Sequence, residues 1–239
     1  MPQVQSLPFV HTPHPAPVAA DQRAQLLANP GFGRVFTDHM VTIRYTEGVG
    51  WHDAKVEPRG PIPMDPASAV LHYAQEIFEG LKAYRTEQGG ATLFRPEQNA
   101  KRFNESARRM AMPELPEELF LEALNQLISI DRDWIPGGDG SLYLRPFMIA
   151  SEAFLGVKPS SEYLFIVIAS SVGAYFKTSA PAVTVWVSRT NLVPSFGPRT
   201  TSSSPTPRGM SARASNCASV SSTWSSLGIA GITRVVSPL

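Results

Sequence analysis

The stretch EYLFIVIASSVG at 162–173 is almost wholly apolar and constrains the fold of this chain more than any other feature. Its length and its β-branched and aromatic residues favour a β-strand. A strand with apolar residues on both faces is typical of the middle of a sheet, where both faces are covered. We therefore expect residues 162–173 to form a central strand.

Several runs of β-branched and aromatic residues supply neighbours for this strand. Gly48 and Gly50 mark the turn of one hairpin, and a Gly-Gly pair marks the turn of another. The further strands predicted in this way are 35–46, 51–57, the part of 67–85 that follows a short helix and Gly80, 88–96 and 141–151.

Two amphipathic helices are expected between these strands. Pro96 suits a first helical turn, and Ala100, Phe103, Ala107 and Met110 then recur with helical spacing. A second apolar stripe lies within 116–130 and consists of Phe120, Ala123, Leu124, Leu127 and Ile128. Residues 31–173 are thus predicted to be an α+β domain with two helices on one face of a sheet.

The segments outside this domain have a different composition. Residues 1–30 are rich in Pro and Ala and are interpreted as a flexible arm, with a short helical pattern at 19–29. Residues 174–189 are interpreted as an interdomain linker and the start of a second domain. Residues 190–239 contain no Asp, Glu, Lys or His but 12 Ser and four Arg. Because a globular surface carries both signs of charge, we infer that two different sequences are joined near residue 189, and we expect the 190–239 tail to be disordered.

Bulk properties exclude several function classes. The formal net charge of +1 gives no general attraction to nucleic acid or an anionic membrane. No apolar run is long enough to span a bilayer, and the N-terminus has Pro and His where a signal peptide would be apolar. A cytoplasmic location is expected. Cys217 is the one cysteine, so neither an intrachain disulfide nor a cysteine-based metal site is expected, and no metal site is predicted.

Five motifs resemble the branched-chain amino acid aminotransferases in order and spacing. They are FGRVFTDHM (32–40), LHYAQEIFEGLKAYR (71–85), LFRPEQNAKRF (93–103), SLYLRPFMI (141–149) and VGAYF (172–176). The resemblance covers about residues 30–189. D-amino acid aminotransferases and aminodeoxychorismate lyases share the same fold, but the strings LHY, FEGLKAYR and SLYLRP weigh against them.

The resemblance implies fold type IV, in which pyridoxal 5′-phosphate lies between a smaller N-terminal and a larger C-terminal domain. The cofactor is the electron sink, and a lysine forms a Schiff base with it. The implied reaction transfers an amino group from Leu, Ile or Val to 2-oxoglutarate, so the implied partners are a small amino acid and a 2-oxo acid. Family members are homodimers.

Arg102 matches the family arginine that binds the cofactor phosphate. A guanidinium fork suits phosphate oxygens, and Arg102 lies off the apolar stripe of its predicted helix. The alternative is a solvated helix arginine.

The resemblance also implies the residues of the substrate site. Tyr73 and Phe78 match residues that line the pocket for the branched side chain, although simple core packing is the alternative. Tyr143 and Arg145 lie two residues apart on one strand and share a face; in the family this pair lies at the substrate carboxylate, and an Arg paired with an acid is the alternative. Tyr175 matches a linker residue that closes over the site, with gap filling as the alternative. In the FEG triplet, Glu79 accompanies Gly80, which we expect to serve a turn.

No lysine is found where the family places its cofactor lysine. That position falls near residues 200–208, which here read TTSSSPTPR, and the last lysine of the chain is Lys177. The family glutamate that contacts the pyridine nitrogen has no counterpart either. Lys82 occupies a position that is not the cofactor lysine and is interpreted as a strand-surface residue, while Lys101 is interpreted as a solvated helix residue.

The sequence therefore predicts no catalytic residue and an inactive or nearly inactive chain of aminotransferase lineage. We interpret the tail as an out-of-frame or mis-spliced product, which the other reading frames of the encoding DNA would test. A non-catalytic fragment, or a dimerisation partner of an intact subunit, is the second hypothesis.

Overall fold

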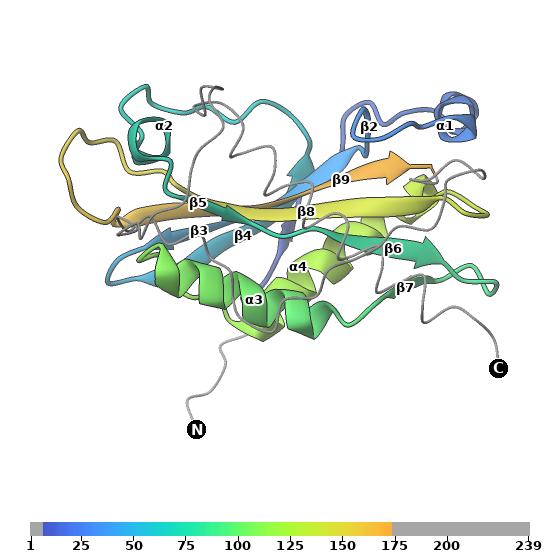
Figure 1. The fold of residues 1–239 in the computed structure, drawn as a ribbon. Helices are drawn as coiled ribbons and strands as arrows, with labels where there is room; N and C mark the ends of the chain where they lie inside the picture. Colours follow the sequence, from blue (N-terminus) through green and yellow to red (C-terminus); the bar gives the residue numbers. More distant parts are fainter. Residues whose placement is uncertain (1–6, 174–239) are drawn as a thin grey trace, which may run out of the picture. The chain divides into compact units, whose positions relative to one another are not determined.

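The computed structural model describes residues 7–173, which form a nine-stranded sheet with helices on both of its faces (Figure 1). The main strand order is β1-β4-β3-β9-β8-β6-β7, while β2 pairs with β9 and β5 pairs with β8. Every pair is antiparallel except β1 with β4. This arrangement confirms the predicted α+β class. Tyr175 and the predicted segments 174–189 and 190–239 lie outside the described residues.

The apolar strand is central, as expected. β9 (Glu162–Val172) lies between β3 (His39–Thr46) and β8 (Ser141–Ala150), with Val41 opposite Val167 and Leu144 opposite Ala169. The other strands are β1 (Val10–His11), β2 (Val35–Phe36), β4 (Gly50–Pro58), β5 (Glu76–Phe78), β6 (Leu81–Arg85) and β7 (Ala91–Leu93). Both predicted hairpins form, as β3–β4 and β6–β7.

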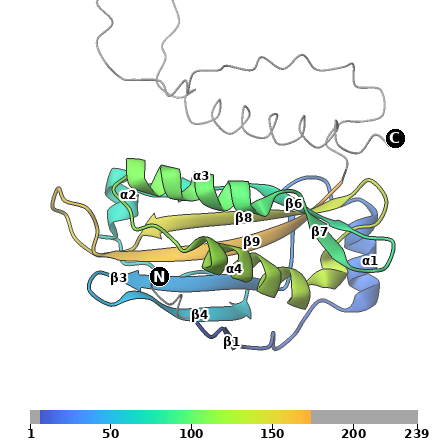
Figure 2. The same cartoon turned by 90° about the horizontal axis from the view of Figure 1, so that it is seen from below.

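Helices α3 (Pro96–Arg109) and α4 (Glu117–Ile130) cover one face of the sheet (Figure 2). All five residues predicted for the apolar stripe of α4 are buried. On α3, Ala100, Phe103 and Ala107 are buried as predicted, but Met110 is 39% exposed because the helix has already ended at Arg109.

Aromatic rings fill the middle of this helix-covered core. The ring of Phe103 lies 5.5 Å from that of Phe120 and 5.6 Å from that of Phe165, measured between centroids. One ring comes from each helix and one from β9, so the cluster fastens both helices to the central strand. Rings at such distances stabilise a core beyond the area that they bury.

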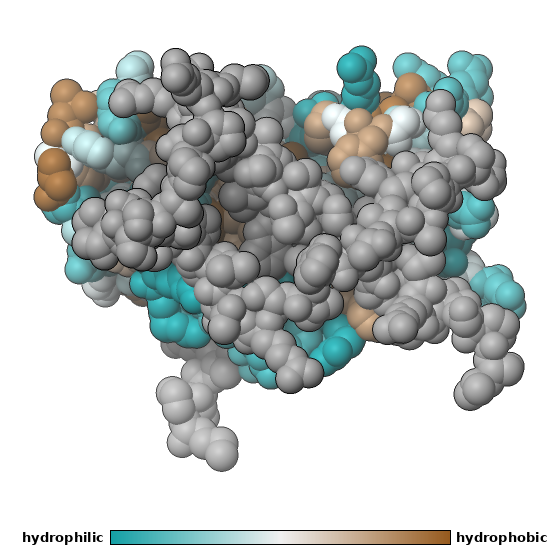
Figure 3. All heavy atoms as spheres, viewed as in Figure 1, coloured by the Kyte–Doolittle hydropathy of each residue, from teal (hydrophilic) through white to brown (hydrophobic). Residues whose placement is uncertain are grey.

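The opposite face of the sheet carries a smaller apolar cluster. Ile149, Leu164 and Ile166 are buried there, beneath the loop that leads to α2 (Ala69–Tyr73). The β8–β9 loop contains exposed apolar residues, Leu155 and Val157, and Figure 3 shows hydrophobic atoms gathered at that end of the sheet. Phe78, Tyr143 and Arg145 of the candidate site lie on the remaining part of this face, whereas Arg102 belongs to α3.

Some predicted boundaries were wrong. The strand expected at 35–46 is interrupted after β2, because Asp38 accepts hydrogen bonds from the Trp134 indole (2.9 Å) and the Val18 N–H (3.1 Å). The strand expected at 88–96 is limited to β7, because Pro96 starts α3. The segment 1–30 contains two regular elements within its described part, β1 and α1 (Ala20–Ala28), and α1 forms where the helical pattern occurs. Within residues 7–173, no helix has the length and apolar character needed to cross a bilayer.

Candidate functional site

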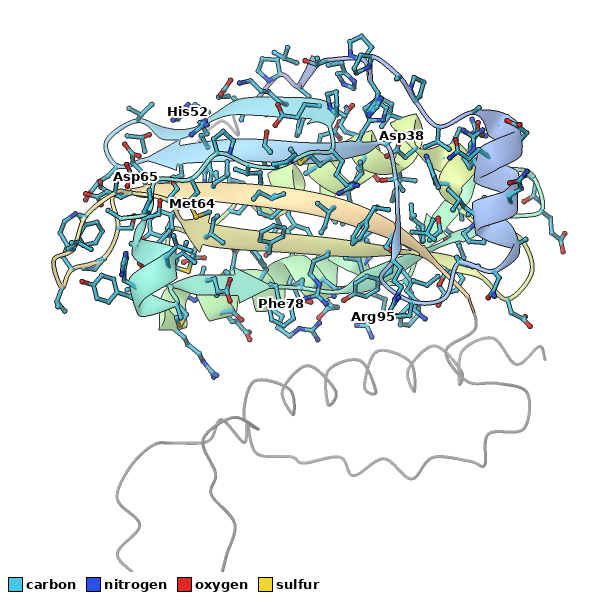
Figure 4. The ribbon with its side chains drawn as sticks, turned by 90° about the horizontal axis from the view of Figure 1, so that it is seen from above. Asp38, His52, Met64, Asp65, Phe78 and Arg95 are labelled. Carbon is cyan, nitrogen blue, oxygen red and sulfur yellow. The ribbon has the colours of Figure 1, made fainter. Side chains whose placement is uncertain are left out.

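Three consecutive residues, Phe78, Glu79 and Gly80, connect most of the residues that the sequence singled out. Phe78 is the last residue of β5, and Glu79 and Gly80 lead into β6, so alternate side chains point to opposite faces of the sheet. Phe78 lies against Arg145, Glu79 binds Arg102, and Gly80 adjoins Tyr143. In Figure 4, Phe78 lies along the edge of the sheet that also carries Arg95, at the start of α3.

Glu79 forms a bidentate ion pair with Arg102. Arg102 donates from Nε to Glu79 Oε1 (2.7 Å) and from Nη2 to Oε2 (2.6 Å), and Asn99 Nδ2 donates to Oε2 (2.9 Å). The Glu79 N–H also donates to the Pro146 carbonyl at 2.8 Å, which fixes the backbone of the triplet on β8. A carboxylate held in this way sets the direction of the guanidinium plane.

The two partners of this pair differ in exposure. The side chain of Glu79 is 5% exposed, whereas that of Arg102 is 43% exposed. The hydrogen bonds to Glu79 raise the pKa of Arg102, although burial acts in the opposite direction. Arg102 is therefore a permanent cation that is oriented by the buried Glu79 carboxylate and partly open to solvent. It is ion-paired, unlike the solvated helix arginine that was the alternative.

Tyr143 and Arg145 share a face of β8, as predicted, and contact each other. Arg145 donates from Nε (3.2 Å) and Nη2 (2.7 Å) to the Tyr143 hydroxyl. The Arg145 guanidinium lies 4.4 Å from the centroid of the Phe78 ring, a cation–π geometry. Among the described residues, Arg145 forms no ion pair with an acid, so the alternative of an acid-paired arginine does not hold there.

Gly80 is required for close approach and not for a turn, which corrects the prediction. Its φ is not in the left-handed region, but a Cβ at this position would clash with the Tyr143 hydroxyl and lie 3.1 Å from the ring carbon Cζ. A glycine here lets the Tyr143 ring lie against the backbone between β5 and β6.

Tyr73 is placed apart from this group. It lies at the end of α2, where its ring contacts those of His72 and Phe154 at 6.2 Å, and it is 42% exposed. The structure thus brings Phe78, Tyr143 and Arg145 into contact. Arg102 is connected to this group through its ion pair with Glu79, the residue after Phe78.

Lys82 is on β6, as predicted, but is half-buried and not a fully exposed surface residue. It is the cross-strand partner of Tyr143, so both side chains point to the same face. Burial lowers the pKa of Lys82. Lys101 is exposed on α3, as expected.

Two residues of this region were missed in the sequence. Asn99 donates the third hydrogen bond to the Glu79 carboxylate. The sequence signal for this role was its position three residues before Arg102, on the same helix face. The ring of Phe32 lies 5.6 Å from that of Tyr143, a long-range contact without a local signal. No cluster of His, Cys, Asp or Glu suited to a metal ion occurs in the part of the chain that the structure describes.

Comparison with known proteins gives a consistent result. No protein-family model matches the chain. The "Probable branched-chain-amino-acid aminotransferase" of Streptomyces coelicolor is 57% identical over 189 residues, which are 78% of this chain and 51% of the relative. The branched-chain-amino-acid aminotransferase of Mycolicibacterium smegmatis is 56% identical over 184 residues, 76% of this chain and 50% of the relative.

A solved structure is also similar. A branched-chain amino acid aminotransferase from T.th., determined with pyridoxamine 5′-phosphate, matches with a TM-score of 0.44 and 28% identity over 58% of this chain and 42% of that one. The chain spans about half the length of the two curated relatives. Over 76–78% of its length, this chain is thus homologous to curated proteins named branched-chain-amino-acid aminotransferase.

Proposed function

We propose that residues 31–173 are the N-terminal domain of a pyridoxal-phosphate enzyme that transfers the amino group of Leu, Ile or Val to 2-oxoglutarate. The names of the relatives at 56–57% identity support the reaction class. The observation that carries the proposal is the triplet 78–80, which positions two arginines. One of them, Arg102, suits a phosphate, and the other, Arg145, suits a carboxylate.

Arg102 is the proposed anchor of the cofactor phosphate. Its chemistry fits, because a half-exposed guanidinium held by a buried carboxylate presents a fixed cation to a phosphate group. Bound pyridoxal phosphate would supply the electron sink for the reaction. Glu79 and Asn99 are then positioning residues, since they orient Arg102 without needing to touch the cofactor.

Arg145 and Tyr143 are the proposed ligands of a substrate carboxylate. A guanidinium has five N–H donors. Arg145 donates from Nε and Nη2 to the Tyr143 hydroxyl, and no other side-chain or backbone acceptor for Arg145 occurs among the described residues. Phe78 supplies an aromatic surface next to this cation, which suits an apolar branched side chain. Tyr73 and Tyr175 are proposed as further walls of the same site.

We also propose that the chain, with its present 190–239 sequence, does not catalyse transamination. Proton transfer at the cofactor needs a primary amine. The resemblance places the cofactor lysine near residues 200–208, and residues 190–239 contain no lysine. Lys82 is a primary amine at a different position, on β6. A non-catalytic role, for example as the dimerisation partner of an intact subunit, is the alternative.

A chimera tests both parts of the proposal. Residues 1–189 are joined to the C-terminal part of the Streptomyces coelicolor relative, and leucine-dependent formation of glutamate from 2-oxoglutarate is measured. We expect turnover by the chimera and none by the present chain. A folded, inactive chimera would refute the assigned reaction, and turnover by the present chain would refute its inactivity. Co-purification of the chain with the intact relative would favour the dimerisation partner.

A further inference from the structure

Lys82 differs from the other lysines among residues 7–173. Lys55 and Lys158 form ion pairs, and Lys101 is exposed on α3. Lys82 has neither an ion pair nor a hydrogen bond with any described residue, yet it is half-buried in the sheet. A cation placed in this way costs stability, which raises the question of what the amine could bind.

The strand register places Lys82 within the Tyr143–Arg145 group. Lys82 is directly opposite Tyr143 across β6 and β8, and Arg145 is two residues further along β8 on the same face. Such a diagonal pair of residues is about 7–8 Å apart. A small molecule of two to four carbons can therefore touch both side chains.

The charges on this face favour an anion. Lys82 and Arg145 are both cations, and within the described part of the chain neither is paired with a carboxylate. The neighbouring acid Glu79 points to the other face, where it binds Arg102. Two cations with no acid between them attract an anionic group, and the fork of Arg145 suits a carboxylate in particular.

Burial lowers the pKa of Lys82, so this amine has a larger neutral fraction near neutral pH than an exposed lysine has. The neutral amine is the form that attacks a carbonyl carbon. The position thus combines a nucleophile with a nearby carboxylate-binding cation.

We propose that Lys82 is an imine-forming site for small aldehydes that carry a carboxylate, with Arg145 binding that carboxylate. The neutral Nζ adds to the aldehyde carbon, a proton moves from nitrogen to oxygen, and water leaves to give the imine. No oxidant or reductant takes part. This reaction needs neither the cofactor nor transamination, but it rests on the carboxylate-binding role that the proposed function gives to Arg145.

Reductive labelling of the full chain tests this proposal. The chain is incubated with glyoxylate or with acetaldehyde, which differ in the carboxylate, and each imine is fixed with cyanoborohydride. Peptide mapping by mass spectrometry then measures the modified fraction of each lysine. We expect glyoxylate to label Lys82 several-fold more than Lys101, and acetaldehyde to show a much smaller preference.

Two variants separate the roles. Lys82→Arg should abolish label at this position and leave label at Lys101 unchanged. Arg145→Gln should reduce glyoxylate labelling of Lys82 without reducing acetaldehyde labelling, with folding checked by circular dichroism. Equal glyoxylate labelling of Lys82 and Lys101 in the unmodified chain, or no effect of Arg145→Gln, would overturn the proposal.

Discussion

Replacing Arg102 with Met should destabilise the chain far more than the exposure of Arg102 suggests. The substitution removes two charged hydrogen bonds to Glu79, whose side chain is only 5% exposed. Removing one partner of a fully buried pair costs about 3–5 kcal/mol. Because Arg102 is 43% exposed and Asn99 still donates to Glu79, we expect a smaller loss in the free energy of unfolding, about 2 kcal/mol.

A double-mutant cycle isolates this interaction. Glu79→Gln alone should cost about 1–2 kcal/mol, and the double variant should cost less than the sum of the two single variants by about 1 kcal/mol or more. Lys101→Met, one residue away on α3 and exposed, is the matched control and should change stability by less than about 0.5 kcal/mol.

Urea unfolding followed by circular dichroism measures the unmodified chain and the four variants under the same conditions. Additive single-variant losses would show that the two side chains do not interact in solution. A loss for Arg102→Met no larger than that for Lys101→Met would also refute the reasoning, because it would mean that Glu79 does not depend on its partner.

Three further predictions use other contacts. Gly80→Ala forces the Tyr143 ring away from Arg145 and should lower the free energy of unfolding by about 1–3 kcal/mol, measured in urea. The control Gly137→Ala, with open space around it, should be nearly neutral. Equal effects of the two substitutions would exclude the close approach of the Tyr143 ring to the backbone at Gly80. Phe103→Ala removes a 1% exposed ring from the aromatic cluster and should cost about 3–5 kcal/mol, and a loss below about 1 kcal/mol would contradict that packing. Lys82→Met should be more stable than the unmodified chain near neutral pH. Because the folded pKa of Lys82 lies below 10.5, the unfolded chain retains the proton to higher pH. The unmodified chain should therefore gain stability relative to the variant as pH rises toward 10.5. If the difference in the free energy of unfolding between the two proteins does not decrease over this range, burial of the amine is refuted.

The sequence predicted those parts of the fold that depend on local pattern. The apolar stripe of α4 and the central position of β9 follow from periodicity and from an unbroken apolar run, and both are confirmed. The pairing of Tyr143 with Arg145 on one face follows from the two-residue period of a strand.

The parts that could not be predicted depend on contacts between distant segments. Asp38 interrupts a strand-like sequence because its carboxylate binds the Trp134 indole, 96 residues away. Gly80 resembles a turn glycine, and only the packing of Tyr143 reveals the close approach. Glu79 and Arg102 are 23 residues apart, so their ion pair has no signal in the spacing of either motif.

The central claim is that the triplet 78–80 positions Arg102, on one face of the sheet, for a phosphate and Arg145, on the other face, for a carboxylate. The most direct measurement is a crystal structure of the chimera of residues 1–189 with pyridoxal phosphate and a branched-chain 2-oxo acid. We predict the cofactor phosphate within hydrogen-bond distance of the Arg102 guanidinium and the carboxylate of the oxo acid on Arg145. A phosphate bound elsewhere, with Arg102 contacting Glu79 and solvent alone, would contradict the account.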